Sequence, residues 1–370
     1  MAETNTKKKS SRSASLEFMR FFAAIFMALI HFTQFCYPDS GYSLTHTVYF
    51  VEMFFMISGY FMMKSICTAS DKAKLPAAHD AFFYTLKKAS AIWGCYISAA
   101  LLTFAIRQFL KADFSLAQCF LELFHGKWEF LMLQMAGFNY NPQFGIDYLV
   151  IPGWFLSSMF IALVPCYYLA RRFERDYSGV VAPISAMVIY CYIIQTYGSI
   201  DVGNQFLGGL MLGVIRAFAG ISLGTFVYHI SERLTDKNGW TVGRNRYWNI
   251  FNVLSFLTVF VSVFLNFDII SPPDLMFYLI PVAIIIISAD LDRGVVSRWL
   301  NSHFVKSSLY LGGLSMYVFI FHTIPLLLWQ EFVHLDNVYI SGILYLAATV
   351  LLSALFQKLQ QSLSKKRAPR

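Results

Sequence analysis

The sequence predicts an all-α, polytopic membrane protein with about ten transmembrane helices and both termini in the cytoplasm. Of its 370 residues, 57% are hydrophobic and only 14% are charged, whereas soluble domains have roughly 25% charged residues. The apolar residues form blocks of about 17–25 residues, which is long enough to cross the hydrocarbon core. These blocks predict spans at 17–37, 47–66, 89–109, 148–170, 180–198, 206–230, 248–267, 273–289, 308–330 and 338–359.

The distribution of basic residues supports this topology. Twenty-five of the 29 Lys and Arg residues fall on the side predicted to be cytoplasmic; Arg107, Lys111 and Lys127 fall outside, and Arg216 lies within a span. This asymmetry follows the positive-inside rule. The net charge of +8 therefore reflects membrane topology, and we expect membrane lipids but no nucleic acid as partners. The expected location is the cell membrane, as a multi-pass protein of a bacterial plasma membrane.

Three parts are predicted along the chain. Residues 1–15 form a disordered basic tail, residues 16–360 a single transmembrane domain, and residues 361–370 a basic cytoplasmic tail. The longest connection, 110–147, contains an amphipathic stretch at 114–124 and predicts an interfacial or re-entrant helix pair outside. A basic start followed by an apolar block also resembles a signal peptide, but no small-residue cleavage site follows, so we expect this block to remain as a span.

Arg20 and His31 in the first span are the main candidates for a functional site. An eleven-residue step returns to within about 20° of the same helix face and rises about 16 Å. Ionisable residues inside a membrane usually mark a site. An imidazole can accept and return a proton, and a guanidinium group matches phosphate oxygens. The alternatives are that His31 is a packing residue bonded to a carbonyl and that Arg20 only anchors the helix end.

Glu52 and Ser58 are candidates in the second span. Glu52 could pair with His31 across the hairpin and fix the tautomer of the ring, or it could be an interfacial carboxylate. Ser58 precedes Gly59, and this pair of small residues favours close helix packing over a substrate contact.

Arg216 and His322 are candidates in later spans. A buried arginine must pair with something, so Arg216 predicts a polar cavity or a ligand phosphate, while Gly220 and Gly224 predict a contact face on the same helix. His322 precedes Pro325, which frees a carbonyl one turn back. His322 could therefore satisfy local backbone or take part in a site.

Several kinds of chemistry lack the residues that they need. The six cysteines show no spacing typical of metal ligands. There is no Walker loop, His-Glu-x-x-His, Gly-x-Ser-x-Gly or acidic cluster for a metal-bound sugar donor. We therefore expect no metal and no tightly bound cofactor.

Taken together, these motifs resemble the membrane-bound acyltransferase 3 family over about residues 15–360. The family marks matched here are Arg20 and His31 at the Arg-x10-His spacing; Phe54, Phe55, Ser58 and Gly59; Trp154, Phe155 and Leu156; Arg216, Gly220 and Gly224; and Ser315, Tyr317, His322 and Pro325. The chain departs from the family where many members have a Glu after the fourth-span Trp. Ser157, Ser158 and Met159 occupy that stretch here.

The resemblance implies transfer of an acyl group, usually acetyl, from cytoplasmic acyl-CoA to a hydroxyl of a surface polysaccharide or lipid-linked sugar. His31 would act as the catalytic base with Glu52 beside it, and Arg20 and Arg216 would bind acyl-CoA. A short-lived acyl-imidazole on His31 is the mechanistic alternative. Ser58, Trp154, Tyr317 and His322 would line the substrate site.

Two other classes of protein compete with this interpretation. A transporter or flippase for a glycan or polar lipid would use the same arginines and histidines to line a path, but no internal symmetry between two halves is visible. A sensory or structural membrane protein would not need Arg20 and His31 on one helix face.

Overall fold

The computed structural model describes residues 13–40, 44–68, 76–111, 115–133, 149–203, 205–235, 242–264 and 272–367. Most of the predicted basic tail, residues 1–12, lies outside the described residues. The first helix begins at Ala14, and both Ala14 and Ser15 are buried.

Helices make up almost all of the described chain. In order they are α1 (Ala14–Cys36), the short 3₁₀ helix η1 (Thr45–Tyr49), α2 (Phe50–Thr68), α3 (Ala77–Leu110), α4 (Leu116–His125), α5 (Lys127–Phe130), α6 (Gly153–Asp176), the π-helical turn η2 (Tyr177–Val181), α7 (Ala182–Tyr197), α8 (Leu212–Thr235), α9 (Val242–Ser262), α10 (Pro272–Leu291), α11 (Val295–His303), α12 (Val305–Phe321), α13 (Thr323–Phe332) and α14 (Val338–Arg367). One antiparallel pair of two-residue strands, β1 (Phe206–Leu207) and β2 (Leu210–Met211), precedes α8.

The helices confirm an all-α polytopic membrane protein, with a lower count of spans than the sequence predicted. Within the described residues, seven helices are long and apolar enough to cross a membrane, or eight if α11 and α12, bent by 96°, form one span. The difference has two causes. Two predicted spans, 148–170 and 180–198, fall in one 45-residue segment and are counted together, although the chain bends at Glu174, whose backbone angles are non-helical. The helix at the predicted span 248–267 is α9, which does not reach the hydropathy of the others.

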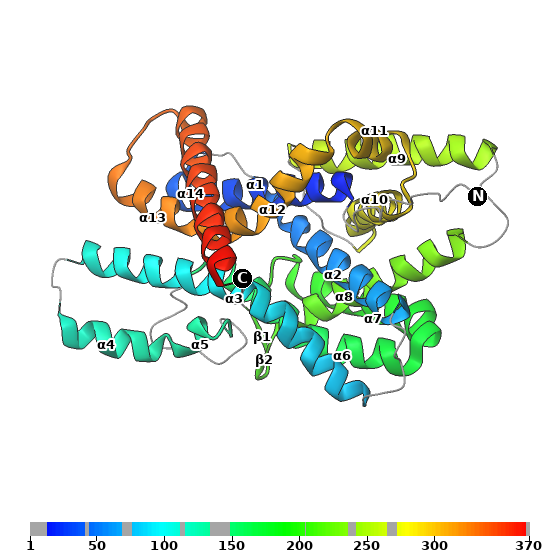
Figure 1. Ribbon diagram of the computed structural model, residues 1–370, viewed down its shortest axis with the longest axis horizontal. Helices are drawn as coiled ribbons and strands as arrows, with labels where there is room; N and C mark the ends of the chain where they lie inside the picture. The colour runs from blue at the N-terminus through cyan, green and yellow to red at the C-terminus, as the bar shows by residue number, and fades with distance from the viewer. Residues whose placement is uncertain are drawn as a thin grey trace.

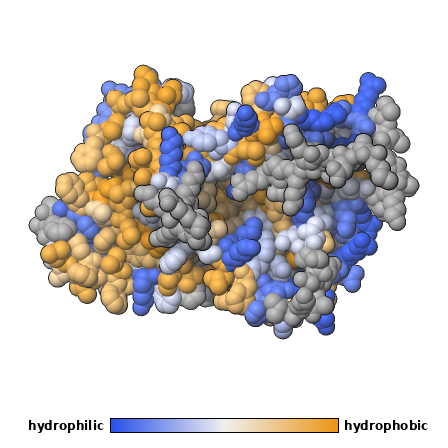
Figure 2. Space-filling view, viewed as in Figure 1, coloured by the Kyte–Doolittle hydropathy of each residue, from blue (hydrophilic) through white to orange (hydrophobic). Residues whose placement is uncertain are grey.

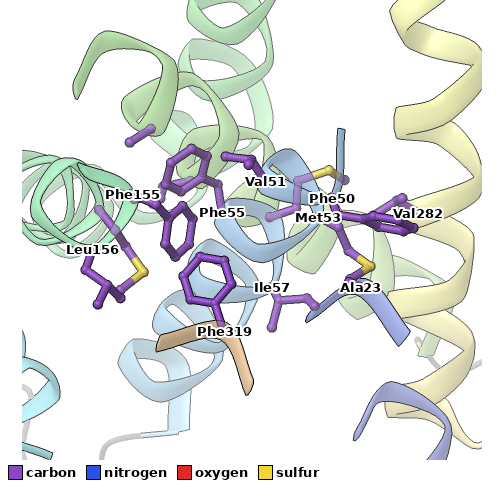
Figure 3. Close-up of a cluster of buried hydrophobic side chains, with 14 of the residues drawn as sticks. Ala23, Phe50, Val51, Met53, Phe55, Ile57, Phe155, Leu156, Val282 and Phe319 are labelled. Atoms are coloured by element: carbon purple, nitrogen blue, oxygen red, sulfur yellow. The ribbon is translucent and has the colours of Figure 1, made fainter. Parts of the chain in front are cut away.

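The largest contacts between helices define two packed groups, one that contains α1 and α12 and one that contains α2 and α8. Helix α1 packs mainly on α12, and α2 packs mainly on α8, which also contacts α6 and α7 (Figure 1). Figure 3 shows where the groups meet, with Phe55 of α2, Phe155 of α6 and Phe319 of α12 in contact. The ring centroids are 4.7 Å apart for Phe55–Phe155 and 5.4 Å apart for Phe155–Phe319. These offset and edge-on contacts are the favourable geometries for aromatic pairs, and they fix the position of α6 against both groups.

The predicted close contact between small residues is confirmed at the interface of α2 and α8. A Cβ atom on Gly59 would overlap the carbonyl group of Ile221, and one on Gly224 would overlap the carbonyl group of Met56. Without side chains at these two positions the helix backbones approach closely, which is the usual basis of helix association in membranes. This contact aligns α2 with α8 and so positions the charged residues described below.

The surface divides into an apolar and a polar part. In Figure 2 hydrophobic residues dominate the half of the visible face that carries α13 and α14, and hydrophilic residues gather toward the side on which the N-terminus lies. Exposed side chains such as Phe109, Ile343 and Leu351 suit contact with lipid chains.

In the outer connection, the predicted amphipathic stretch forms α4. This helix is tied to the end of α3 by an ion pair between Lys111 and Glu122, with a closest distance of 2.6 Å. The rest of the predicted interfacial pair is represented by the short helix α5, and residues 134–148 lie outside the described residues.

Candidate active site

Arg20 and His31 lie on one unbroken helix. Helix α1 runs from Ala14 to Cys36 without a kink, so the eleven-residue separation corresponds to a rise of about 16 Å along one face. Its companion helix α12 ends at Phe321, directly before His322. The packing of α1 on α12 therefore brings the two intramembrane histidines together.

His31 and His322 form a hydrogen-bonded pair. The Nδ1 atom of His31 lies 2.8 Å from Nε2 of His322, and the rings stack with centroids 5.0 Å apart. His322 is fully buried, whereas His31 keeps partial exposure. On its other side, Nδ1 of His322 lies 2.9 Å from the carbonyl oxygen of Phe319 and 3.3 Å from that of Val318.

These contacts determine which ring nitrogens carry protons when both rings are neutral. A carbonyl oxygen can only accept, so Nδ1 of His322 must be the donor and its Nε2 must be an acceptor. Nδ1 of His31 must then donate to that acceptor. The Nε2 atom of His31 is left with an unprotonated lone pair, which is the form of imidazole that can remove a proton.

The break between α12 and α13 is what places His322. Pro325 has no amide hydrogen to give to the turn before it, so the helix ends at Phe321 and restarts at Thr323. The His322 carbonyl accepts from the backbone amide of Leu326 at 3.2 Å and from the hydroxyl of Tyr345 at 3.3 Å. His322 therefore contacts local carbonyls and also His31, and its part in a functional site stays a prediction.

Glu52 pairs with Arg216, and the predicted pairing of Glu52 with His31 is wrong. Nε of Arg216 donates to one Glu52 carboxylate oxygen at 2.7 Å, and Nη2 donates to the other at 2.6 Å. Both side chains are completely buried. The physical reason is that a buried guanidinium needs a carboxylate far more than a neutral imidazole does, and the contact of α2 with α8 supplies this carboxylate.

Further contacts surround the Arg216 guanidinium. Nη2 also donates to the Val48 carbonyl at 3.0 Å, and the guanidinium carbon lies 5.7 Å from the centre of the Trp154 ring. Within the described residues, Nη1 has no hydrogen bond, and it lies 3.9 Å from a carboxylate oxygen of Asp201, which is half-exposed. The structure thus brings together three of the predicted site residues, namely Glu52, Trp154 and Arg216.

Arg20 has one ionic partner and one cationic neighbour. Its Nη1 atom lies 3.3 Å from both carboxylate oxygens of Glu17, which is buried, while the Arg20 side chain is 34% exposed. Lys88 of α3 is close enough for its charge to interact with that of Arg20. Two cations against one carboxylate leave a net positive charge at this end of α1, which favours an anionic ligand.

The remaining predicted residues make packing contacts. Ser58 donates to the carbonyl of Phe54 at 2.8 Å and lies 3.4 Å from the sulfur of Met159. The hydroxyl of Tyr317 donates to the side-chain oxygen of Gln360 at 2.7 Å. Neither contacts the histidine pair through a hydrogen bond.

Sequence reasoning missed three charged residues near the predicted site, and two of them left a signal. Glu17 lies three residues before Arg20, which is the spacing of neighbours on a helix surface. Lys88 falls at the inner end of a predicted span, at the same depth as Arg20. Asp201 lies in a loop, and no sequence pattern connects it with Arg216. In the described part of the chain, no group of three or more His, Cys, Asp or Glu side chains is arranged to hold a metal ion.

These observations define a helical membrane protein that has a histidine pair and, about 16 Å away along the same helix, a cationic end. A family model described as an acyltransferase domain (Acyl_transf_3) matches residues 13–358. The chain therefore belongs to the membrane-bound acyltransferase 3 family, and it is an acyltransferase. No curated protein and no solved structure matches the chain.

Proposed function

We propose that this enzyme transfers an acyl group, most readily acetyl, from cytoplasmic acyl-CoA to a hydroxyl of a surface polysaccharide or lipid-linked sugar in the cell membrane. The observation that carries the proposal is the hydrogen bond between His31 and His322, which leaves a free lone pair on Nε2 of His31. An acceptor hydroxyl is a poor nucleophile until a base removes its proton. His31 is a partly exposed, oriented base on the same helix as a cationic end.

During the transfer step one proton moves from the acceptor hydroxyl to His31 and then to the coenzyme A thiolate. Nε2 of His31 takes the proton of the acceptor hydroxyl as the oxygen attacks the thioester carbonyl carbon. The tetrahedral intermediate collapses with cleavage of the carbon–sulfur bond, the acyl group remains on the acceptor oxygen, and the coenzyme A thiolate takes the proton back from His31. His322 supports the positive charge on His31 during this step because its Nε2 accepts the Nδ1 hydrogen throughout.

Arg20 binds a phosphate of the donor. Coenzyme A is polyanionic and cytoplasmic, and its pantetheine arm is comparable in length with the rise of about 16 Å from Arg20 to His31. The Arg20 side chain is partly exposed, so its guanidinium group is accessible to a ligand. Lys88 adds a second positive charge beside it.

Glu52 and Arg216 serve as positioning residues in this scheme. Their charges neutralise one another in a bidentate pair, so neither charge is left for a base partner or for a coenzyme A phosphate. They hold α2 against α8 and place Trp154, whose ring faces the Arg216 guanidinium, near the half-exposed Asp201.

The test is transfer of labelled acetyl from acetyl-CoA to endogenous glycan or lipid-linked sugar in membrane vesicles. We expect the label to appear with wild type, to disappear with His31→Ala, and to persist with the control His79→Ala, which changes an exposed histidine elsewhere. Retained transfer in His31→Ala at equal protein level would overturn the assignment of His31.

A second measurement separates direct transfer from an acyl-imidazole on His31. Purified enzyme is mixed with labelled acetyl-CoA without acceptor and quenched within seconds. Label bound to the wild-type protein but absent from His31→Ala would favour the covalent route. Release of coenzyme A only when acceptor is added would favour direct attack.

A further inference from the structure

A cavity separate from the histidine pair lies between the end of α6 and the end of α8. It has a volume of about 460 Å³ and is lined by Arg175, His229, Glu232, Arg233 and Thr235. In Figure 1 helix α8 ends on the side where the N-terminus lies, and Figure 2 shows that hydrophilic residues gather on this side. The transfer chemistry described above uses none of these side chains.

The cavity is built around a buried histidine. His229 is only 9% exposed. The Arg233 Nε group donates to its Nε2 atom at 2.9 Å, so Nε2 is an acceptor and Nδ1 carries the hydrogen. Nδ1 lies 3.4 Å from the hydroxyl of Ser178, which is fully buried. This chain of contacts holds the Arg233 side chain in one orientation.

The two arginines keep hydrogen-bond donors available. Arg233 uses Nε for His229, and within the described residues its Nη1 and Nη2 atoms have no partner. Arg175 lies 3.7 Å from Glu232 through one nitrogen and is 76% exposed. The lining carries two cations and one carboxylate, so it has a net positive charge. Guanidinium groups in this arrangement match the oxygens of a phosphate bidentately.

The local backbone is shaped around the same place. Glu174, one residue before Arg175, has φ 37° and ψ −106° inside α6, a conformation that costs a non-glycine residue energy. The π-helical turn η2 follows at Tyr177–Val181, and such turns are frequent at functional sites. The kink at Glu174 redirects the chain so that Arg175 on α6 and Ser178 on η2 both face α8.

We propose that this cavity binds a phosphate group at the cytoplasmic end of the bundle, independently of the histidine pair. The phosphate belongs to a soluble coenzyme or nucleotide, to a lipid headgroup or to free phosphate, and the same guanidinium chemistry recognises all three. A phosphate placed between Arg175 and Arg233 neutralises the excess positive charge of the lining.

The test is equilibrium binding of labelled pyrophosphate to the full chain in nanodiscs of neutral lipid. We expect saturable binding to wild type, a loss of roughly tenfold to a hundredfold in affinity for Arg233→Gln, and a smaller loss for His229→Asn, which removes the acceptor that orients Arg233. The matched control is Arg172→Gln, which removes an exposed arginine of α6 outside the cavity lining and should bind as wild type does. Thermal unfolding of each variant verifies that it is folded.

Competition then identifies the source of the phosphate. Displacement of pyrophosphate by coenzyme A assigns the site to a soluble phosphate-bearing cofactor, and weaker binding in nanodiscs that contain phosphatidic acid assigns it to a lipid headgroup. Displacement by inorganic phosphate alone assigns it to the free ion. Equal affinity of folded Arg233→Gln and wild type, or no saturable binding to wild type, would overturn the proposal. Because the readout is binding, these outcomes are independent of whether acyl transfer depends on His31.

Discussion

Replacement of His322 tests the hydrogen-bond chain that leads to the proposed base. In the wild type, Nδ1 of His31 lies 2.8 Å from Nε2 of His322. The variant His322→Leu removes this acceptor, and it also removes the donor to the carbonyl oxygen of Phe319. His31 is then free to rotate or to carry its hydrogen on Nε2, where it cannot act as a base. We expect kcat to fall while KM for acyl-CoA stays near the wild-type value, because Arg20 lies about 16 Å away along α1.

The size of the decrease has a lower and an upper bound. The loss of one hydrogen bond of about 1 kcal/mol corresponds to about fivefold in rate. The loss of the whole contribution of a general base corresponds to roughly 10²–10⁴-fold. Because the ring of His31 remains and only its tautomer and orientation are released, we expect a decrease of about a hundredfold, between these bounds.

The conservative variant His322→Gln supplies the control. Its amide oxygen can accept from His31 while its amide nitrogen donates to the carbonyls of the preceding turn, so we expect part of the activity to return. The assay is initial rate against acetyl-CoA concentration in vesicles with equal amounts of folded protein. A kcat of His322→Leu within threefold of wild type, or no difference between Leu and Gln at this position, would refute the reasoning.

Three further substitutions test the surrounding structure. Glu52→Gln leaves the buried charge of Arg216 unpaired and should cost about 3–5 kcal/mol of stability, measured by thermal unfolding in detergent. The double variant with Arg216→Met should recover most of this loss. Unchanged stability of Glu52→Gln would argue against the ion pair. Gly224→Val drives a side chain into a carbonyl of α2 and should lower the yield of folded protein, whereas Gly209→Ala, which has open space around it, should not. Arg20→Gln should raise KM for acyl-CoA by about tenfold and change kcat little; an unchanged KM would contradict a phosphate contact.

Local patterns in the sequence predicted much of the fold. The first span, with Arg20 and His31 on one face, depends only on helix geometry, and α1 has this form. The contact at Gly59 and Gly224 was predictable because small residues at helical spacing have few other roles inside a membrane. The break beside Pro325 was likewise signalled by a residue that cannot continue a helix.

The number of spans was harder to predict, because hydropathy alone does not show where a helix bends. The chain from Gly153 to Tyr197 is interrupted at Glu174, whose backbone angles are non-helical, and no residue type there signals the interruption. The bend of 96° between α11 and α12 also depends on tertiary packing.

The partner of His31 could not be predicted from the sequence, since Glu52 and His322 were both available within the membrane. Which of these two residues contacts His31 depends on how α1 is aligned with α12 and α2 with α8. Only the packing of the helices determines this alignment. The observed choice has a physical advantage. A carboxylate beside His31 would hold the imidazole in its protonated, ion-paired form and would bring a charge into the core, whereas a neutral histidine leaves the pair uncharged at rest.

In the proposed mechanism, charge develops on His31 only while it holds the proton of the acceptor. In that state its Nδ1 hydrogen still points at the acceptor nitrogen of His322, whose own hydrogen is fixed by the Phe319 carbonyl. The donors and acceptors are thus aligned before the reaction, and no reorientation is needed when the charge appears. Such a prearranged environment is the main way in which a protein stabilises a transition state. Here the Phe319 carbonyl, exposed by the helix break, orients the hydrogen bonds of both histidines.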